Sequence, residues 1–184
     1  MSSTPLTELT GEYLLDPAHT RIGFVARHAM VTKVRGHFKE FEGSAHLDGN
    51  DPSKSSTTVT IKTASIDTGN EQRDGHLRTN DFLDAPKFPE IVFTSTGIEA
   101  LGGERYRLNG NLTIKDVTRP VSLDVEYDGS ARDPFGNLRV GFEGSTTISR
   151  KDYGITWNAP LEGGGVLVGD KVVLEFDVSA IRQD

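Results

Sequence analysis

One short polar stretch interrupts a chain that otherwise alternates apolar and polar residues in the manner of β-strands. It begins at Asn70, whose side chain suits an N-cap, and Glu71 suits the positive end of a helix dipole. It ends at Asp84-Ala85-Pro86 and Phe88-Pro89. Leu77 is the one large apolar side chain in its first half, so we expect a thinly packed helix that covers one end of a β-barrel.

The rest of the chain alternates with period two over segments near ten residues long, which predicts strands. The clearest prediction is a hairpin, in which residues 106–114 and 121–127 alternate around a tight connection. The pattern of residues 34–47 reverses near Lys39-Glu40, which indicates a bulge or a corner. One apolar face on each strand can build a sandwich or a barrel, and closure into a barrel removes the exposed edges. We therefore predict an all-β, antiparallel barrel of about eight strands, with one helix capping or flanking an end.

Length, composition and charge limit the function further. The chain has 184 residues, which fits one domain, with a flexible polar segment at residues 1–10 and a barrel at residues 11–184. There is no Cys, the formal net charge is -7, and no basic cluster stands out, so we expect no nucleic-acid partner. No stretch is apolar enough for stable membrane insertion, and the N-terminus lacks a secretory signal, so we expect a soluble cytoplasmic protein.

Four stretches run in order from Tyr13 toward the C-terminus. They are Tyr13–Thr20 with Phe24, His28, Gly36, Phe38 and Gly43 at fixed spacing, Arg73–Arg78 with Asp81–Asp84 and Phe88-Pro89, Gly110–Val121, and Ser149–Gly154. Together they resemble the polyisoprenoid-binding YceI-like family. The resemblance implies an extended, lipocalin-like barrel with an apolar tunnel for polyprenyl lipids or quinones, no other cofactor, and a homodimer. Asp116 stands where the family usually has Gly, and Asp tolerates positive φ better than most residues.

The residues that we expect to contact a ligand are mostly apolar and face one side of their strands. They are Ile22, Phe24, Ala26, His28, Phe38, Leu77, Phe82, Phe93, Phe142 and Trp157. His28 could contact a polar head group or be a hydrogen-bonded core histidine. Trp157, the single tryptophan, could line the tunnel or fill the core.

Three charged residues are candidates for a polar head group at the tunnel mouth. Arg73, Asp74 and Arg150 are possible head-group contacts, and an Arg could pair with a phosphate or a carbonyl. The alternative for Arg73 and Asp74 is structural: an i,i+4 ion pair of Asp74 with Arg78, or Arg73 joining the helix to the barrel rim. We expect no metal site, because histidines at positions 19, 28, 37 and 46 do not share one face of a strand at this spacing.

The main functional hypothesis is binding, transport or storage of a long amphiphilic isoprenoid, a polyprenyl phosphate or a prenylated quinone. The first alternative is an enzyme that isomerises or cyclises a lipophilic intermediate, with His28 as a base. The sequence has no Gly-x-Ser-x-Gly elbow and no phosphate-binding loop, so we expect no enzyme. A third alternative is a barrel packed solid with its own side chains.

Overall fold

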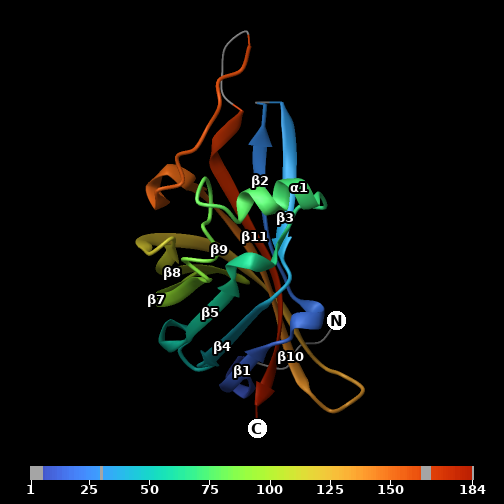
Figure 1. Cartoon of the computed structure of the whole chain (residues 1–184). Coiled ribbons are helices and arrows are strands. Elements are labelled where there is room, and N and C mark those ends of the chain that lie inside the picture. Colours follow the sequence, from blue (N-terminus) through green and yellow to red (C-terminus); the bar gives the residue numbers. More distant parts are fainter. Residues whose placement is uncertain (1–5, 30, 163–166, 184) are drawn as a thin grey trace.

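The computed structural model describes residues 6–29, 31–162 and 167–183. Eight strands close an antiparallel barrel in the order β1-β4-β5-β7-β8-β9-β10-β11, with β11 pairing back to β1 (Figure 1). The predicted all-β barrel is confirmed. The strands are β1 (Gly11–Leu15), β2 (Arg21–His28), β3 (Thr32–Phe38), β4 (Phe41–Leu47), β5 (Ser56–Lys62), β6 (Ile66–Asp67), β7 (Glu90–Gly102), β8 (Arg105–Ile114), β9 (Val117–Arg132), β10 (Leu138–Ser149) and β11 (Val168–Gln183).

The helical elements are short. The described residues contain one α-helix, α1 (Glu71–Leu77), and five 3₁₀ turns: η1 (Leu6–Glu8), η2 (Pro17–His19), η3 (Pro52–Lys54), η4 (Thr63–Ser65) and η5 (Arg150–Tyr153). Within the same residues, no helix has the length and apolarity that crossing a membrane requires.

β11 is 16 residues long and has two successive partners on one edge. β1 pairs with residues 180–183, and β2 pairs with residues 168–177. The predicted corner at Lys39-Glu40 is confirmed, because β3 ends at residue 38 and β4 begins at residue 41. As a result, β4 stays in the barrel wall beside β1, while β3 follows β2. The β2–β3 hairpin therefore projects at the end opposite to the two termini (Figure 1).

The helix begins where the sequence predicts and ends earlier. Asn70 Oδ1 accepts a hydrogen bond from Arg73 N at 3.0 Å, which confirms the N-cap. The helix stops at Leu77 after seven residues, and the predicted continuation to Asp84 is wrong. Thr79 and the Asn that follows it are poor helix formers, and Thr79 Oγ1 donates to the His76 carbonyl at 2.6 Å. The chain then forms a series of turns.

The N-terminal segment is partly packed against the barrel. Residues 1–5 lie outside the described residues, whereas Leu9 is 3% exposed in the core around Tyr13 and Tyr127. Tyr13 Oη donates a hydrogen bond to the Leu9 carbonyl at 2.7 Å. Residues 6–10 therefore lie on the end of the barrel rather than extending free of it.

Arg139 joins β10 to the junction between β1 and β2. Its Nη1 is 2.6 Å from Asp16 Oδ2, and its Nε is 2.8 Å from Asp133 Oδ2. Hydrogen bonds from Arg139 and His19 lower the pKa of Asp16 to about 2. Burial opposes ionisation of Asp133, but hydrogen bonds from Asn137 and Arg139 outweigh it and lower that pKa to about 2. Both carboxylates are thus stabilised in their charged form.

Glycines lie beneath inward-facing aromatic rings on neighbouring strands. A Cβ on Gly36 would overlap the ring of Phe24, and a Cβ on Gly110 would overlap the ring of Phe93. By contrast, a Cβ on Gly97 would have no neighbour within 4 Å. The absence of a side chain at the first two positions therefore allows close packing of each ring against the barrel wall.

We predict that Gly36→Ala lowers the free energy of unfolding by about 1–3 kcal/mol, because the new methyl group must displace the Phe24 ring. Urea denaturation at neutral pH measures this difference. The matched control is Gly97→Ala, which should leave stability unchanged or raise it by up to about 1 kcal/mol. Equal losses in both variants would contradict the packing account.

We predict that stability falls as pH drops from the ordinary carboxyl pKa of 3.8 toward about 2, because Asp16 and Asp133 ionise more readily in the folded state. Arg139→Gln should be less stable than the wild type at neutral pH, and this difference should shrink over the same pH range. Denaturant unfolding at a series of pH values measures both effects. Arg105→Gln, at an exposed position, is the control; a pH-independent effect of Arg139→Gln would contradict the prediction.

Candidate ligand-binding cavity

A cavity of about 400 Å³ runs inside the barrel, within the usual range for small-molecule sites. Its lining includes Leu9 and Tyr13, which pack together near the termini, and Leu77 and Phe82, which belong to α1 and the turns after it. Its wall is almost entirely apolar. The interior is therefore hollow and apolar, and the alternative of a barrel packed solid with its own side chains is wrong.

Strand alternation builds the wall. On β8, β9 and β11, every second side chain faces the cavity. These residues are Tyr106, Leu108, Leu112 and Ile114 on β8; Val121, Leu123, Val125 and Tyr127 on β9; and Val172, Leu174, Phe176 and Val178 on β11. The same alternation is visible in the sequence. These residues were nevertheless absent from the predicted ligand contacts, and period two along each strand was the signal that could have included them.

Eight of the ten predicted contact residues line the cavity. They are Ile22, Phe24, Ala26, Phe38, Leu77, Phe82, Phe93 and Phe142. The structure does not place His28 there: it is exposed at the outer end of β2. The placement of His28 in the tunnel wall is wrong, although Val168, its partner on β11, does line the cavity.

Trp157 also lies outside the cavity lining. Its ring packs 4.9 Å from the His76 ring and 5.3 Å from the Phe82 ring, measured between centroids. His76 Nε2 is in turn 2.8 Å from Asp81 Oδ2. Trp157 therefore supports Phe82, which does line the cavity, from behind.

Arg73 and Asp74 hold the start of α1 in place. Asp74 is 3% exposed and accepts hydrogen bonds from Thr68 N at 2.9 Å and Thr68 Oγ1 at 2.6 Å. Arg73 donates to Thr68 Oγ1 and to the Thr68 carbonyl. The expected Asp74–Arg78 ion pair is not formed: Arg78 contacts Glu71 instead. Neither Arg73 nor Asp74 lines the cavity, and these hydrogen bonds join the loop before α1 to the helix.

Arg150 is the one charged side chain among the described residues that is both buried and part of the cavity wall. It is 3% exposed, and its guanidinium donates to four carbonyl oxygens, those of Ile155, Trp157, Val168 and Gly169. Burial lowers the pKa of the Arg150 guanidinium, and Asp170 opposes this effect. An Arg side chain remains protonated in proteins, so Arg150 is charged at neutral pH. Arg150 thus places a positive charge at the α1 end of an apolar cavity.

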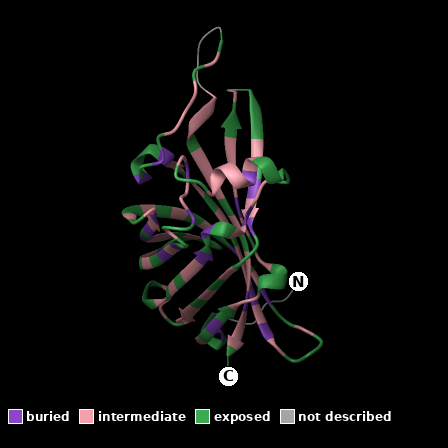
Figure 2. Cartoon of the chain, in the orientation of Figure 1, coloured by how far each residue is buried: buried purple, intermediate pink, exposed green. Residues whose placement is uncertain are grey.

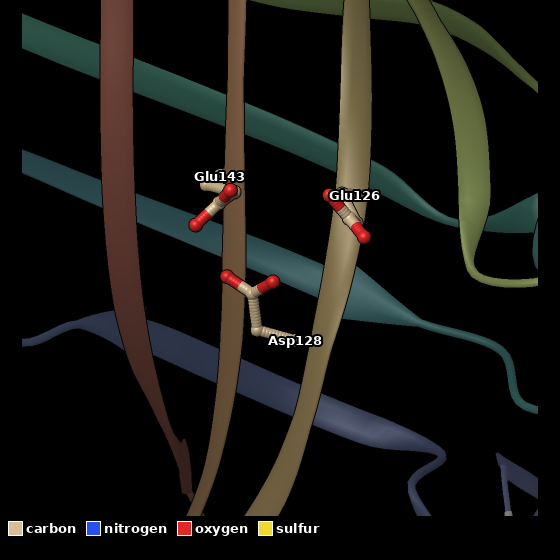
Figure 3. Close-up of side chains that lie close together, drawn as sticks. All are labelled: Glu126, Asp128 and Glu143. Carbon is tan, nitrogen blue, oxygen red and sulfur yellow. The ribbon is translucent and has the colours of Figure 1, made fainter.

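Three acidic residues lie close together on the outside of the barrel. Figure 3 shows Glu126 and Asp128 on β9 and Glu143 on β10, with their carboxylates within 4.8 Å of one another. Repulsion from Asp128 is the main cause of the raised pKa of Glu143. In the described part of the chain, this is the only group of three or more ligand-type side chains at such distances, and it contains no histidine. All three are exposed, so water solvates them.

Comparison with known proteins agrees with this architecture. The sequence profile of the YceI-like domain matches residues 13–180. The chain belongs to the YceI-like family. Relatives include a UPF0312 protein of Shewanella baltica, 37% identical over 153 residues that cover 82% of this chain and 80% of the relative. A UPF0312 protein of Photorhabdus laumondii is 42% identical over 147 residues, 79% of this chain and 76% of the relative.

Solved structures show the same fold. Campylobacter jejuni YceI protein has a TM-score of 0.72 and 30% identity, covering 86% of this chain and 90% of its own. Burkholderia cenocepacia BcnA has a TM-score of 0.78 and 24% identity, covering 90% and 98%. A Saccharophagus degradans domain described as polyisoprenoid-binding has a TM-score of 0.71 and 14% identity, covering 93% and 98%. The last two establish the likeness of fold alone.

Proposed function

We propose that this YceI-like protein binds a long isoprenoid chain in its barrel and carries or stores it. The observation on which the proposal rests is an apolar cavity that reaches from Leu9 to Phe82. Each isoprene unit has five carbons, and at about 0.8 kcal/mol for each buried carbon it gains roughly 4 kcal/mol before costs. Ordering a flexible chain offsets much of this gain. A chain of several units therefore has enough apolar surface for stable binding.

The family supports the same ligand class. The Saccharophagus degradans domain with this fold is described as binding polyisoprenoids. A featureless apolar cavity selects poorly between ligands, so selectivity needs a polar contact. We place that contact at Arg150, which would bind the phosphate of a polyprenyl phosphate or a carbonyl of a prenylated quinone. The enzymatic alternative has little support, because the described cavity lining contains no histidine that could act as the base.

The direct test is mass spectrometry of an organic extract of the freshly purified protein, where we expect a prenyl lipid in stoichiometric amount. Ala26→Trp should abolish this co-purification, because Ala26 lines the cavity and the indole would fill it. Val25→Trp is the matched control, since Val25 is the next residue on β2 and is not part of the lining. Retention of the lipid by a folded Ala26→Trp protein would disprove the binding site.

The test of Arg150 is a comparison of a polyprenyl phosphate with the alcohol of the same chain length. The wild type should prefer the phosphate by about 10- to 100-fold, the range for a hydrogen bond between charged groups. Arg150→Gln should lose this preference while still binding the alcohol. Arg150→Gln also loses stability, because four carbonyl groups lose their donor. The ratio of phosphate affinity to alcohol affinity, measured for each protein separately, cancels this general effect. An unchanged ratio would show that Arg150 has a structural role alone.

A further inference from the structure

The β2–β3 hairpin and the residue that follows it carry a local excess of positive charge. Residues 21–39 contain five Arg and Lys residues and no Asp or Glu. Since the whole chain has a formal net charge of -7, the remaining residues sum to -12, that is, -7 minus 5. The expectation that no basic cluster exists is therefore wrong. An acidic protein has one basic hairpin.

The register of the two strands brings cations together on the outer face. Arg27 on β2 lies directly opposite Lys33 on β3, and Val25 lies opposite Arg35. Ala26 and Val34, which are paired between these positions, face the other way, and Ala26 lines the cavity. Like charges directly opposite each other destabilise a strand pair. The arrangement of Arg27 and Lys33 therefore has a cost in stability that the fold itself does not require.

Two cations near the base of the hairpin have acidic partners, whereas Arg21 at the start of β2 and the two cations near the tip form no ion pair with the described residues. Arg35 Nη1 is 3.8 Å from Glu175 Oε1, and Lys39 Nζ is 3.6 Å from Asp67 Oδ2. Among the described residues, Arg27 and Lys33 form no ion pair and no side-chain hydrogen bond, and both are exposed.

The acidic side chain on the adjacent part of β11 is already engaged. Asp170 accepts hydrogen bonds from Ser149 Oγ at 2.7 Å and from Lys151 N at 3.4 Å. These contacts lower its pKa and leave it directed toward β10. The unpaired cations near the tip of the hairpin are therefore available to an external anionic partner.

An exposed apolar side chain accompanies these cations. Val31, in the turn between β2 and β3, is 78% exposed. The outer parts of both strands are exposed and extend beyond α1 (Figure 2). An apolar tip flanked by cations matches the interface of a bilayer with anionic lipids, where phosphate groups lie beside acyl chains. A nucleic acid would use the cations but offers no comparable apolar layer.

We propose that the β2–β3 hairpin docks on an anionic lipid bilayer, with Arg27 and Lys33 on the lipid phosphates and Val31 between the head groups. The net charge does not prevent this, because charges separated by more than about 8 Å are largely screened at physiological ionic strength. The docking surface goes beyond the isoprenoid-binding function. Ala26, on the same strand as Arg27, lines the cavity, so the docking surface could serve to load or unload it. That use of the surface rests on the proposed function.

The test is sedimentation of the full chain with vesicles of phosphatidylcholine alone or of phosphatidylcholine mixed with phosphatidylglycerol. We expect binding to the mixed vesicles only, with affinity that falls as salt rises. Arg27→Gln with Lys33→Gln should weaken it about 30-fold, the effect expected for two cations near an anionic surface. The same double variant should be as stable as the wild type or more so, because it removes a like-charge pair.

Two controls locate the surface. Lys54→Gln with Lys87→Gln makes the same change in net charge at exposed lysines elsewhere, and should leave vesicle binding unchanged. Val31→Asp should weaken binding, whereas Phe135→Asp should not, although Phe135 is 87% exposed in the β9–β10 turn. The proposal would be overturned if the wild type did not bind the mixed vesicles or bound neutral vesicles equally well. Loss of binding in Phe135→Asp but not in Val31→Asp would also overturn it.

A separate measurement distinguishes this proposal from the proposed function. Polyprenyl alcohol binding is measured in detergent solution without vesicles, for the wild type and for the Arg27→Gln, Lys33→Gln double variant. Loss of vesicle binding with unchanged alcohol binding supports the docking surface. Vesicle binding by a wild-type protein that binds no polyprenyl alcohol would refute the carrier function and leave the docking surface intact.

Discussion

The barrel depends on one edge of β11, whose backbone groups stay hydrogen-bonded where the pairing passes from β1 to β2. β1 and β2 pair with successive parts of that edge, and Ser179 lies at the gap between them. Asp16 N donates to the Ser179 carbonyl at 2.8 Å, and Ser179 N donates to Thr20 Oγ1 at 3.1 Å. The backbone groups at the break thus remain satisfied, as buried polar groups must. Arg139 then fixes the carboxylate of Asp16, so one junction both closes the barrel through β1 and passes the edge of β11 to β2.

An eight-stranded barrel has an interior that its own side chains can fill, so an open cavity needs an explanation. The glycines on neighbouring strands supply one. A Cβ on Gly36 or Gly110 would overlap the ring of Phe24 or Phe93, which means that the edge of each ring lies against the backbone at a glycine. Gly144 has the same relation to an inward-facing ring on β11. Rings that lie along the wall cover backbone with apolar surface and leave the middle of the barrel free. The aromatic residues therefore shape the cavity rather than fill it.

The sequence predicted features that depend on neighbours along the chain and missed those that depend on neighbours in space. Alternation with period two correctly placed Phe24 on the inner face, because the pleat of a strand is local. It failed at His28, which is exposed and outside the lining although its partner Val168 on β11 lines the cavity. Asp74 has a buried structural role that helix spacing did not reveal, because its partner lies in the loop before α1. The excess of positive charge in residues 21–39 could have been counted in the sequence, but the position of Arg27 opposite Lys33 depends on strand register.

The uneven charge distribution also favours one orientation of the molecule at an anionic surface. Glu126, Asp128 and Glu143 lie on the outer face of the wall, and the raised pKa of Glu143 reflects their repulsion. Such a surface repels an anionic membrane, while Arg27 and Lys33 on the projecting hairpin are attracted to it. With screening over about 8 Å, the charge nearest a surface has more influence than the net charge. A molecule with these two regions turns its hairpin toward an anionic surface, which brings the end of the barrel with Ala26 and Arg150 nearer to the lipid than the end with the termini.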